Sequence, residues 1–263
     1  MARSVSFGMW WAWGTFEPGE QEMREDLERR DFIKTVGLVA TAAAASTLGQ
    51  QSAQAQPAMQ SGAKPMAYDI KPFTLDPKSV KGISEKILIS HYENNYAGAV
   101  KRLNAIATQL AELDFAKAPN FLINGLKREE LVAMNSMILH EAYFDSLGGG
   151  GWPRGSLAEA IAHDFGSVDR WRAEFSAMGK AEGGGSGWVL LSYSPHDKRL
   201  VNQWAADHTN AVAGGRPVIA LDMYEHAYHM DYGAKAGAYV DAFMEAINWD
   251  NAVKLYDRVS RDG

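Results

Sequence analysis

The chain has 263 residues, of which 46% are hydrophobic and 22% charged, proportions typical of a soluble globular protein with a buried core. Its formal net charge is -6 and its basic residues are scattered, which disfavours a nucleic-acid partner, because phosphates require a concentrated Lys/Arg surface. Cysteine is absent, which excludes disulfides, thiolate ligands and a cysteine nucleophile, so any bound metal must use His, Asp or Glu.

The N-terminal region has the parts of a twin-arginine export signal in their usual order. Arg29 and Arg30 precede an apolar, alanine-rich run at residues 36–48. That run suits the hydrophobic region of a signal peptide and is shorter than the ~20 residues that a membrane span needs. Ala-Gln-Ala at 53–55 then offers a signal-peptidase site. We predict that the twin-arginine machinery exports the folded protein to the periplasm or the exterior, that residues 1–55 are removed, and that the mature form has no membrane segment.

Two features of this region stay open. A surface helix can also contain adjacent arginines and several alanines, although the order and spacing of the parts favour a signal. Met23 is an alternative start to Met1, because residues 1–22 precede the usual first part of a signal. Residues 56–67 are polar, with Pro and Gly, and are expected to form a linker.

Helical periodicity marks the next part of the chain, residues 68–148. Residues 131–144 are apolar at helical spacing, and an earlier run shows apolar residues at spacings of three, four, five and seven. These two runs predict a hairpin of two long helices. Four glycines at 148–151 then break the pattern and predict a domain boundary near residue 150. The earlier run consists of Ile83, Ile87, His91, Tyr96, Val100, Leu103 and Leu110.

After the glycines, residues 149–263 alternate between helical and strand patterns. A turn at 195–198 joins two of the strands, which predicts that they pair antiparallel. We therefore predict an α+β protein, in which the long α-helical hairpin is followed by a C-terminal α/β domain with a small antiparallel three-stranded sheet. The expected helices are 156–164, 168–182 and 239–258, and the expected strands are 188–193, 199–205 and 217–221.

Four residues from separate segments are candidate metal ligands. Asp222 lies where an apolar strand ends, and His226 follows four residues later, so a carboxylate and an imidazole can converge there. His91 and His140 lie on or beside the apolar stripes of the two long helices and are expected to point inward. Three imidazoles and one carboxylate suit iron or manganese and leave a position for solvent. Taken singly, however, an interior histidine is more often a hydrogen-bonded core residue.

Several motifs follow one another in the order found in one protein family. From residue 73 to the C-terminus the chain resembles the iron/manganese superoxide dismutases, and the Asp-x-x-Glu-His-Ala-Tyr segment is the most specific match. The matching segments are Ser90-His91-Tyr92, Val100-x-x-Leu103-Asn104, Leu157-Ala-Glu-Ala-Ile-Ala, Phe165-Gly166-Ser167, Gly185-Ser-Gly-Trp188, Asp222-x-x-Glu225-His226-Ala227-Tyr228 and Asn248-Trp249.

The resemblance implies both an activity and a cofactor. Carried over by position, it implies that His91, His140, Asp222 and His226 hold one iron or manganese ion per subunit, with iron slightly favoured. The implied reaction converts superoxide to dioxygen and hydrogen peroxide by redox cycling of that ion. The alternative is a metal-binding protein of the same fold with little or no dismutase activity.

One departure from the family concerns the group that hydrogen-bonds the metal-bound solvent. The family offers a glutamine from one of two locations. The first holds Ser136 here, which is too short to reach, and the second aligns with His208. We predict that His208 is the catalytic hydrogen-bond donor, the alternative being an ordinary surface histidine beside Asp207.

Other departures alter the expected substrate funnel. The family's gateway tyrosine and histidine are Ala99 and Asn95 here, and its funnel arginine aligns with Ala236, beside Lys235. Weaker steering of the superoxide anion is the expected consequence. Tyr96 lies five residues after the first ligand, which is about 140° around a regular α-helix, so we expect it to be a packing residue.

The resemblance also implies a homodimer, although a tetramer stays open. In the family, the glutamate corresponding to Glu225 bonds the ligand histidine, here His226, of the other subunit. A second contact across that interface has changed on both sides, to Asn95 and His229. An amide facing an imidazole can still hydrogen-bond, so we expect this pair to meet in the dimer.

Overall fold

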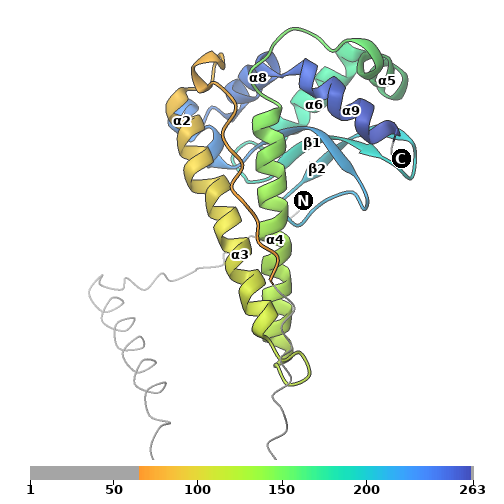
Figure 1. Cartoon of the computed structure of the whole chain (residues 1–263). Coiled ribbons are helices and arrows are strands. Elements are labelled where there is room, and N and C mark those ends of the chain that lie inside the picture. The colour runs from red at the N-terminus through yellow and green to blue at the C-terminus, as the bar shows by residue number, and fades with distance from the viewer. Residues whose placement is uncertain (1–64, 262–263) are drawn as a thin grey trace, which may run out of the picture. The chain divides into compact units, whose positions relative to one another are not determined.

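The first part of the described chain is a helical hairpin, as the periodicity predicted. The computed structural model describes residues 65–261, and the predicted export signal lies outside them. The helices α3 (Ala97–Glu112) and α4 (Asn120–Asp145) lie side by side and antiparallel (Figure 1). Their facing sides bury residues from both helices, among them Leu103 and Met137.

The first helix of the hairpin is longer than α3 alone. It starts as α2 (Glu85–Ser90), where the hydroxyl of Ser84 accepts the N–H of Ile87 as a typical N-terminal cap. It then continues through a π-helical segment, η2 (His91–Tyr96), into α3. Hydrogen bonds from residue i to i+5 are rare and, where they occur, are frequently at functional sites. His91 is the first residue of this segment.

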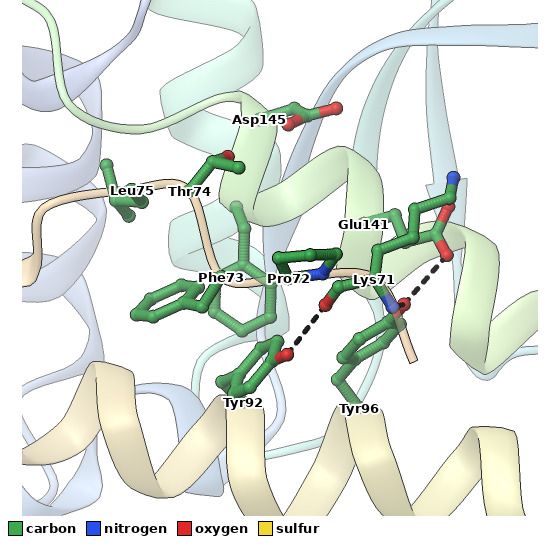
Figure 2. Close-up of a pocket in the computed structure, with 10 residues that line it drawn as sticks. Lys71, Pro72, Phe73, Thr74, Leu75, Tyr92, Tyr96, Glu141 and Asp145 are labelled. Atoms are coloured by element: carbon green, nitrogen blue, oxygen red, sulfur yellow. Dashed lines mark hydrogen bonds and ion pairs between the residues drawn. The ribbon is translucent and has the colours of Figure 1, made fainter. Parts of the chain in front are cut away.

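An extended segment precedes these helices and lies along the hairpin (orange in Figure 1). Tyr92 and Tyr96 point from η2 towards Lys71 of this segment (Figure 2). A short 3-10 turn, η1 (Pro77–Ser79), then leads the chain to α2.

The second half contains the predicted antiparallel sheet, with strand order β2-β1-β3. β1 is the central strand and is buried along its whole length. In its register, Trp188 lies opposite both Ala205 and Asp222, so the end of the sheet brings these three residues together. The strands are β1 (Trp188–Ser194), β2 (Arg199–Ala205) and β3 (Arg216–Asp222).

A glycine makes this end of the sheet possible. Gly187 precedes β1 with φ 151°, in a conformation that other residues rarely adopt. A Cβ atom there would collide with the carbonyl oxygen of Ala205 and would lie 2.8 Å from Oε1 of Glu182. The backbone can therefore approach these groups only without a side chain.

Helices cover the sheet and complete the fold. The C-terminal part was expected to be one helix over 239–258, but it is two helices. Ile247 pairs with Leu147 in an isolated β-bridge, and the N–H of Asn248 bonds to the carbonyl of Ser146 at 2.7 Å. These contacts with the end of α4 interrupt the helix. The helices are α5 (Gly155–Phe165), α6 (Val168–Glu182), α7 (His229–Tyr232), α8 (Ala236–Ala246) and α9 (Trp249–Arg261), with a 3-10 turn, η3 (Glu225–Ala227).

Ser146 also fixes the hairpin to the sheet. Its hydroxyl accepts the N–H of Ala220 in β3 at 3.1 Å. The end of α4 is thereby held against the strand that ends in Asp222. The domain boundary predicted near residue 150 stays a prediction. Among the described residues, no helix is both long and apolar enough to cross a membrane.

Candidate metal centre

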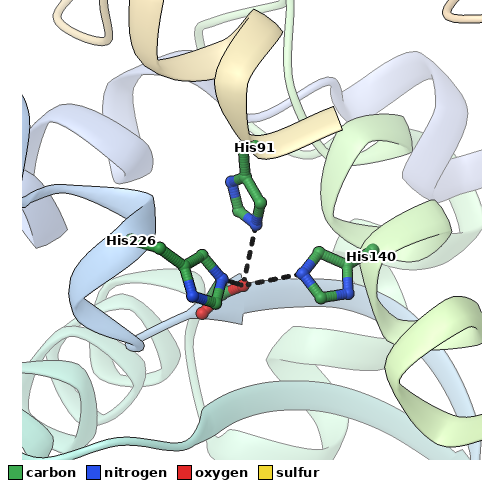
Figure 3. Close-up of side chains that lie close together, drawn as sticks. His91, His140 and His226 are labelled. Atoms are coloured by element: carbon green, nitrogen blue, oxygen red, sulfur yellow. Dashed lines mark hydrogen bonds and ion pairs between the residues drawn. The ribbon is translucent and has the colours of Figure 1, made fainter. Parts of the chain in front are cut away.

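The four predicted ligands come together from four different elements. His91 starts η2, His140 lies in α4, Asp222 ends β3 and His226 lies in η3. The three labelled imidazole rings converge on one point (Figure 3). Each residue offers one donor atom, and these atoms all lie within 4.8 Å of one another.

One carboxylate oxygen is the centre of this cluster. The Oδ2 atom of Asp222 lies 3.1 Å from Nε2 of His91, 3.3 Å from Nε2 of His226 and 3.7 Å from Nε2 of His140. His91, His140 and Asp222 are at most 1% exposed, whereas 27% of the His226 side chain is exposed. The cluster is therefore enclosed on three sides and open beside His226.

The hydrogen bonds around the cluster leave donor atoms free for an ion. His140 donates its Nδ1–H to the carbonyl of Ser136 at 2.6 Å, so its Nε2 carries a lone pair. That Nε2 is buried and has no hydrogen-bond partner within residues 65–261, which is costly unless another group binds it. The backbone N–H of Tyr224 bonds to Oδ1 of Asp222 at 2.8 Å, which leaves Oδ2 for the cluster. Three imidazole nitrogens and one carboxylate oxygen fit a transition metal.

The environment favours the protonation states that metal binding needs. Burial lowers the pKa of His140 to about 3, and the nearby His91 adds to this effect. Burial also lowers the pKa of His91, although Asp222 opposes it. For Asp222, burial alone raises the pKa of the carboxyl, but attraction and hydrogen bonds from His226 and His91 hold it well below its usual range. Neutral imidazoles and an ionised carboxylate are the forms that bind a metal.

His208 lies next to this cluster, 6.1 Å from His140 between ring centroids. The indole N–H of Trp188 donates to its Nδ1 at 3.0 Å. Because an indole can only donate, Nδ1 must accept, and the imidazole proton must be on Nε2. Burial lowers the pKa of His208, which favours this neutral form. The side-chain amide of Asn135 also holds the carbonyl of His208, at 2.5 Å.

Tyr224 and Trp188 also contact the cluster or His208, although neither was predicted to be a site residue. The ring of Tyr224 stacks on His208 at 4.7 Å and 13°, and on His226 at 5.4 Å and 17°. Trp188 belongs to the Gly-Ser-Gly-Trp motif, which matched the family but did not indicate that Trp188 bonds to His208. Tyr224 lies between two predicted site residues in the sequence, which was the available signal for it.

The altered funnel positions have different exposures. Ala99 and Ala236 are buried, Asn95 is half-buried and Lys235 is exposed. A phenol or guanidinium is therefore missing from the two buried positions, and the adjacent cation lies at the surface. Tyr96 is buried, as predicted, but the angle of 140° does not apply, because η2 is not a regular α-helix.

Comparison with known proteins identifies the family. The family description "Iron/manganese superoxide dismutases, C-terminal domain" matches residues 153–255. The iron superoxide dismutase of Cupriavidus metallidurans is 67% identical over 197 residues, which cover 75% of this chain and 100% of that protein. The chain belongs to the iron/manganese superoxide dismutase family. Among other superoxide dismutases, manganese superoxide dismutase 1 of Halobacterium salinarum is 34% identical over 197 residues, covering 73% of this chain and 96% of that protein.

The relatives are named as iron superoxide dismutases or as manganese superoxide dismutases. The iron superoxide dismutase of Aquifex pyrophilus is 34% identical over 195 residues, which cover 71% of this chain and 90% of that protein. The relatives thus include iron and manganese proteins at similar identity. The family assignment confirms the predicted fold, with its helical N-terminal part and its three-stranded antiparallel sheet.

Proposed function

We propose that the protein is a superoxide dismutase, which converts superoxide to dioxygen and hydrogen peroxide with one iron or manganese ion per subunit. The observation that carries the proposal is the cluster of four donor atoms within 4.8 Å, in a chain 67% identical to an iron superoxide dismutase. The proposed ligands are His91, His140, Asp222 and His226. The name of the Cupriavidus relative slightly favours iron.

Residues around the four ligands orient the groups that the reaction needs. A bound iron or manganese ion would supply one-electron redox chemistry, which lets one superoxide be oxidised and the next reduced. His208 carries its proton on Nε2 and, in our proposal, donates from that atom the hydrogen bond that the family obtains from glutamine. Trp188 holds that imidazole in the required tautomer. Tyr224 orients the Asp222 carboxylate through its backbone N–H.

The test is superoxide consumption per bound ion, measured on protein loaded separately with iron, manganese and zinc. We expect turnover with iron or manganese and none with zinc, because zinc has no redox chemistry. Tight binding of iron and manganese without turnover would instead establish the alternative, a metal-binding protein of this fold. The departures at Ala99, Asn95 and Ala236 favour a rate lower than that of relatives with an intact funnel.

A twofold homodimer completes the proposed site. Glu225 and His229 are exposed and His226 is partly exposed, so these side chains are available to a second subunit. With Nε2 of His226 directed at Asp222, its Nδ1 is the atom left for the Glu225 carboxylate of the neighbour. Asn95 of one subunit and His229 of the other form the second proposed contact.

The remaining part of the proposal is that the protein is exported and loses its signal, residues 1–55. The twin arginines, the short apolar run and the Ala-Gln-Ala at 53–55 support removal of residues 1–55 and a periplasmic or secreted mature protein. A quarter of the chain lies outside the match to the Cupriavidus relative, although that relative is covered completely. A twin-arginine route suits a metalloprotein, because the ion is bound by the fold before the protein leaves the cytoplasm.

A further inference from the structure

Residues 68–75, which we name the strap, are fixed to the helical hairpin by polar contacts with their backbone. The side-chain amide of Asn104 accepts the N–H of Tyr68 and donates to its carbonyl, both at 2.8 Å. At Lys71, the hydroxyl of Tyr96 accepts the backbone N–H at 2.9 Å, and the hydroxyl of Tyr92 donates to the carbonyl at 2.6 Å (Figure 2). Both polar backbone groups of Lys71 are thus satisfied by tyrosines.

These two tyrosines belong to the same helical turn as a proposed metal ligand. η2 starts at His91, contains Tyr92 and ends at Tyr96. Tyr96 also donates to Oε1 of Glu141 at 3.0 Å, and Glu141 follows the ligand His140 in α4. Burial raises the pKa of Tyr96 to about 12, so its hydroxyl keeps the proton that it donates. Tyr96 therefore connects the strap to both helices that carry ligands.

An aromatic contact leads from the strap to the ligand itself. Phe73 of the strap stacks on Tyr92 at 4.7 Å and meets the ring of Phe144 edge-on at 5.1 Å. Phe144 in turn meets the ring of His91 edge-on at 5.2 Å. The strap thus contacts His91 through one intervening aromatic ring, Phe144.

A pocket lies beside the strap. It has a volume of about 270 Å³, is open to solvent on one side, and has Phe73, Phe144 and Asp145 among its lining residues. Segments whose backbone hydrogen bonds are exposed to solvent are the ones that open locally. The hydrogen bonds to the backbone of Lys71 therefore add to the Phe73 contacts, and to the ion pair between Lys71 and Glu141, in keeping the strap closed.

We propose that Tyr92 and Tyr96 are positioning residues, which hold the strap closed over η2 and thereby keep His91 on the metal ion. Opening of the strap frees the turn that carries His91 and so limits how fast the ion leaves. The part that concerns the ion rests on the proposed function. The part that concerns the strap rests only on contacts between the strap and the hairpin.

The experiment compares full-length wild type with Tyr92→Phe, Tyr96→Phe and the double variant, all loaded with iron or manganese. Tyr92→Phe removes one hydrogen bond to Lys71, Tyr96→Phe removes one to Lys71 and one to Glu141, and both changes keep the ring. The matched control is Tyr232→Phe, which removes the bond from a tyrosine hydroxyl to the carbonyl of Gly82, away from the strap. Two quantities are measured, hydrogen exchange in peptides that contain Lys71 and the rate at which a chelator extracts the ion.

We expect Tyr92→Phe to raise both rates about fivefold, Tyr96→Phe at least about fivefold and the double variant at least about 25-fold, since one hydrogen bond contributes about 1 kcal/mol. The control should change neither rate. Faster exchange with an unchanged extraction rate would show that the strap does not control the ion, and unchanged exchange would show that the tyrosines do not hold the strap. If wild type retains no ion at all, the proposed function fails too, an outcome distinct from variants that release the ion as wild type does.

Discussion

The indole N–H of Trp188 donates to Nδ1 of His208 at 3.0 Å and so places the imidazole proton on the opposite nitrogen. Trp188→Phe removes this donor, so that the proton of His208 can move to Nδ1. Superoxide consumption per bound ion should then fall by roughly 10–100-fold, the range typical for groups that orient a metal site. Metal content should not change. Trp204→Phe, at an exposed position on β2, is the control.

His208 itself provides the complementary prediction. His208→Gln offers an N–H donor of similar reach, whereas His208→Ala offers none, so the glutamine variant should retain more activity per ion than the alanine variant. Equal activity in wild type and His208→Ala would show that this histidine has no part in catalysis. Both measurements need metal analysis of the same samples, because a lost ion would imitate a lost donor.

His91→Ala and Asp222→Ala should each abolish tight metal binding, because a site of four protein ligands loses affinity and geometry when one is removed. Metal content after extensive dialysis is the measurement. His196→Ala is a matched control, since His196 is an exposed histidine in the turn between β1 and β2. A full equivalent of ion in either ligand variant would show that the ligand set is wrong.

Glu182 should make the stability of the protein depend on pH. Its carboxylate is buried, without a hydrogen-bond partner among the described residues, and burial together with the charge of Asp222 raises its pKa from 4.5 to about 8. Between these values the folded state holds a proton that the unfolded chain has released. Its stabilising contribution is therefore present below about pH 4.5 and is lost as the pH rises towards 8, by at most about 1.4 kcal/mol per pH unit.

Glu182→Gln removes this titration and keeps the shape of the side chain. Thermal unfolding of the metal-loaded wild type and variant, compared from about pH 5 to 9, should show the wild type losing stability relative to the variant as pH rises. If the unfolding temperatures of wild type and variant differ by the same amount at every pH in this range, the Glu182 carboxyl has the same pKa in the folded and unfolded states.

The proposed dimer predicts coupling between Asn95 and His229. A double-mutant cycle with alanine at each position, measured as dimer dissociation, should give a coupling free energy of about 0.5–1.5 kcal/mol, the usual contribution of one hydrogen bond. A coupling near zero would mean that the two side chains do not meet. Glu225→Ala should also weaken metal retention, although Glu225 is not one of the four proposed ligands.

Replacing Arg29 and Arg30 with Lys should keep the protein in the cytoplasm, because the twin-arginine receptor reads the residues and not only their charge. Cell fractionation measures the result, with Arg24→Lys as the control for a change of basic residue outside the Arg29–Lys34 stretch. Mature protein that still reaches the periplasm in normal amounts would contradict the signal assignment.

Much of the fold followed from local pattern, and what did not depends on distant contacts. Helical periodicity predicted the hairpin, and the turn at 195–198 predicted the pairing of β1 with β2. The break at Ile247 escaped prediction, because it depends on pairing with Leu147, 100 residues earlier in the chain. The π-helical form of η2 was not predicted either, although the five-residue step from His91 to Tyr96 in the periodic run was the available signal for it.

Some features of the candidate site were likewise visible in the sequence, and others depend on distant contacts. The interior positions of His91 and His140 followed from apolar stripes on two helices. The position of Asp222 at a strand end was also visible in the sequence. The hydrogen bond from Trp188 to His208 was not, because it joins the start of β1 to a loop 20 residues later. Contacts of this kind depend on register in the sheet, which periodicity alone does not specify.

The hydrogen bond from the Tyr224 backbone to Oδ1 of Asp222 bears on which ions the site can select. That hydrogen bond favours binding of an ion through the other oxygen, Oδ2, and the remaining three donors are nitrogens. Calcium prefers six to eight oxygen ligands, and magnesium an octahedron of oxygens. The abundant divalent cations of the cell are therefore disfavoured here, and a backbone amide contributes to that discrimination.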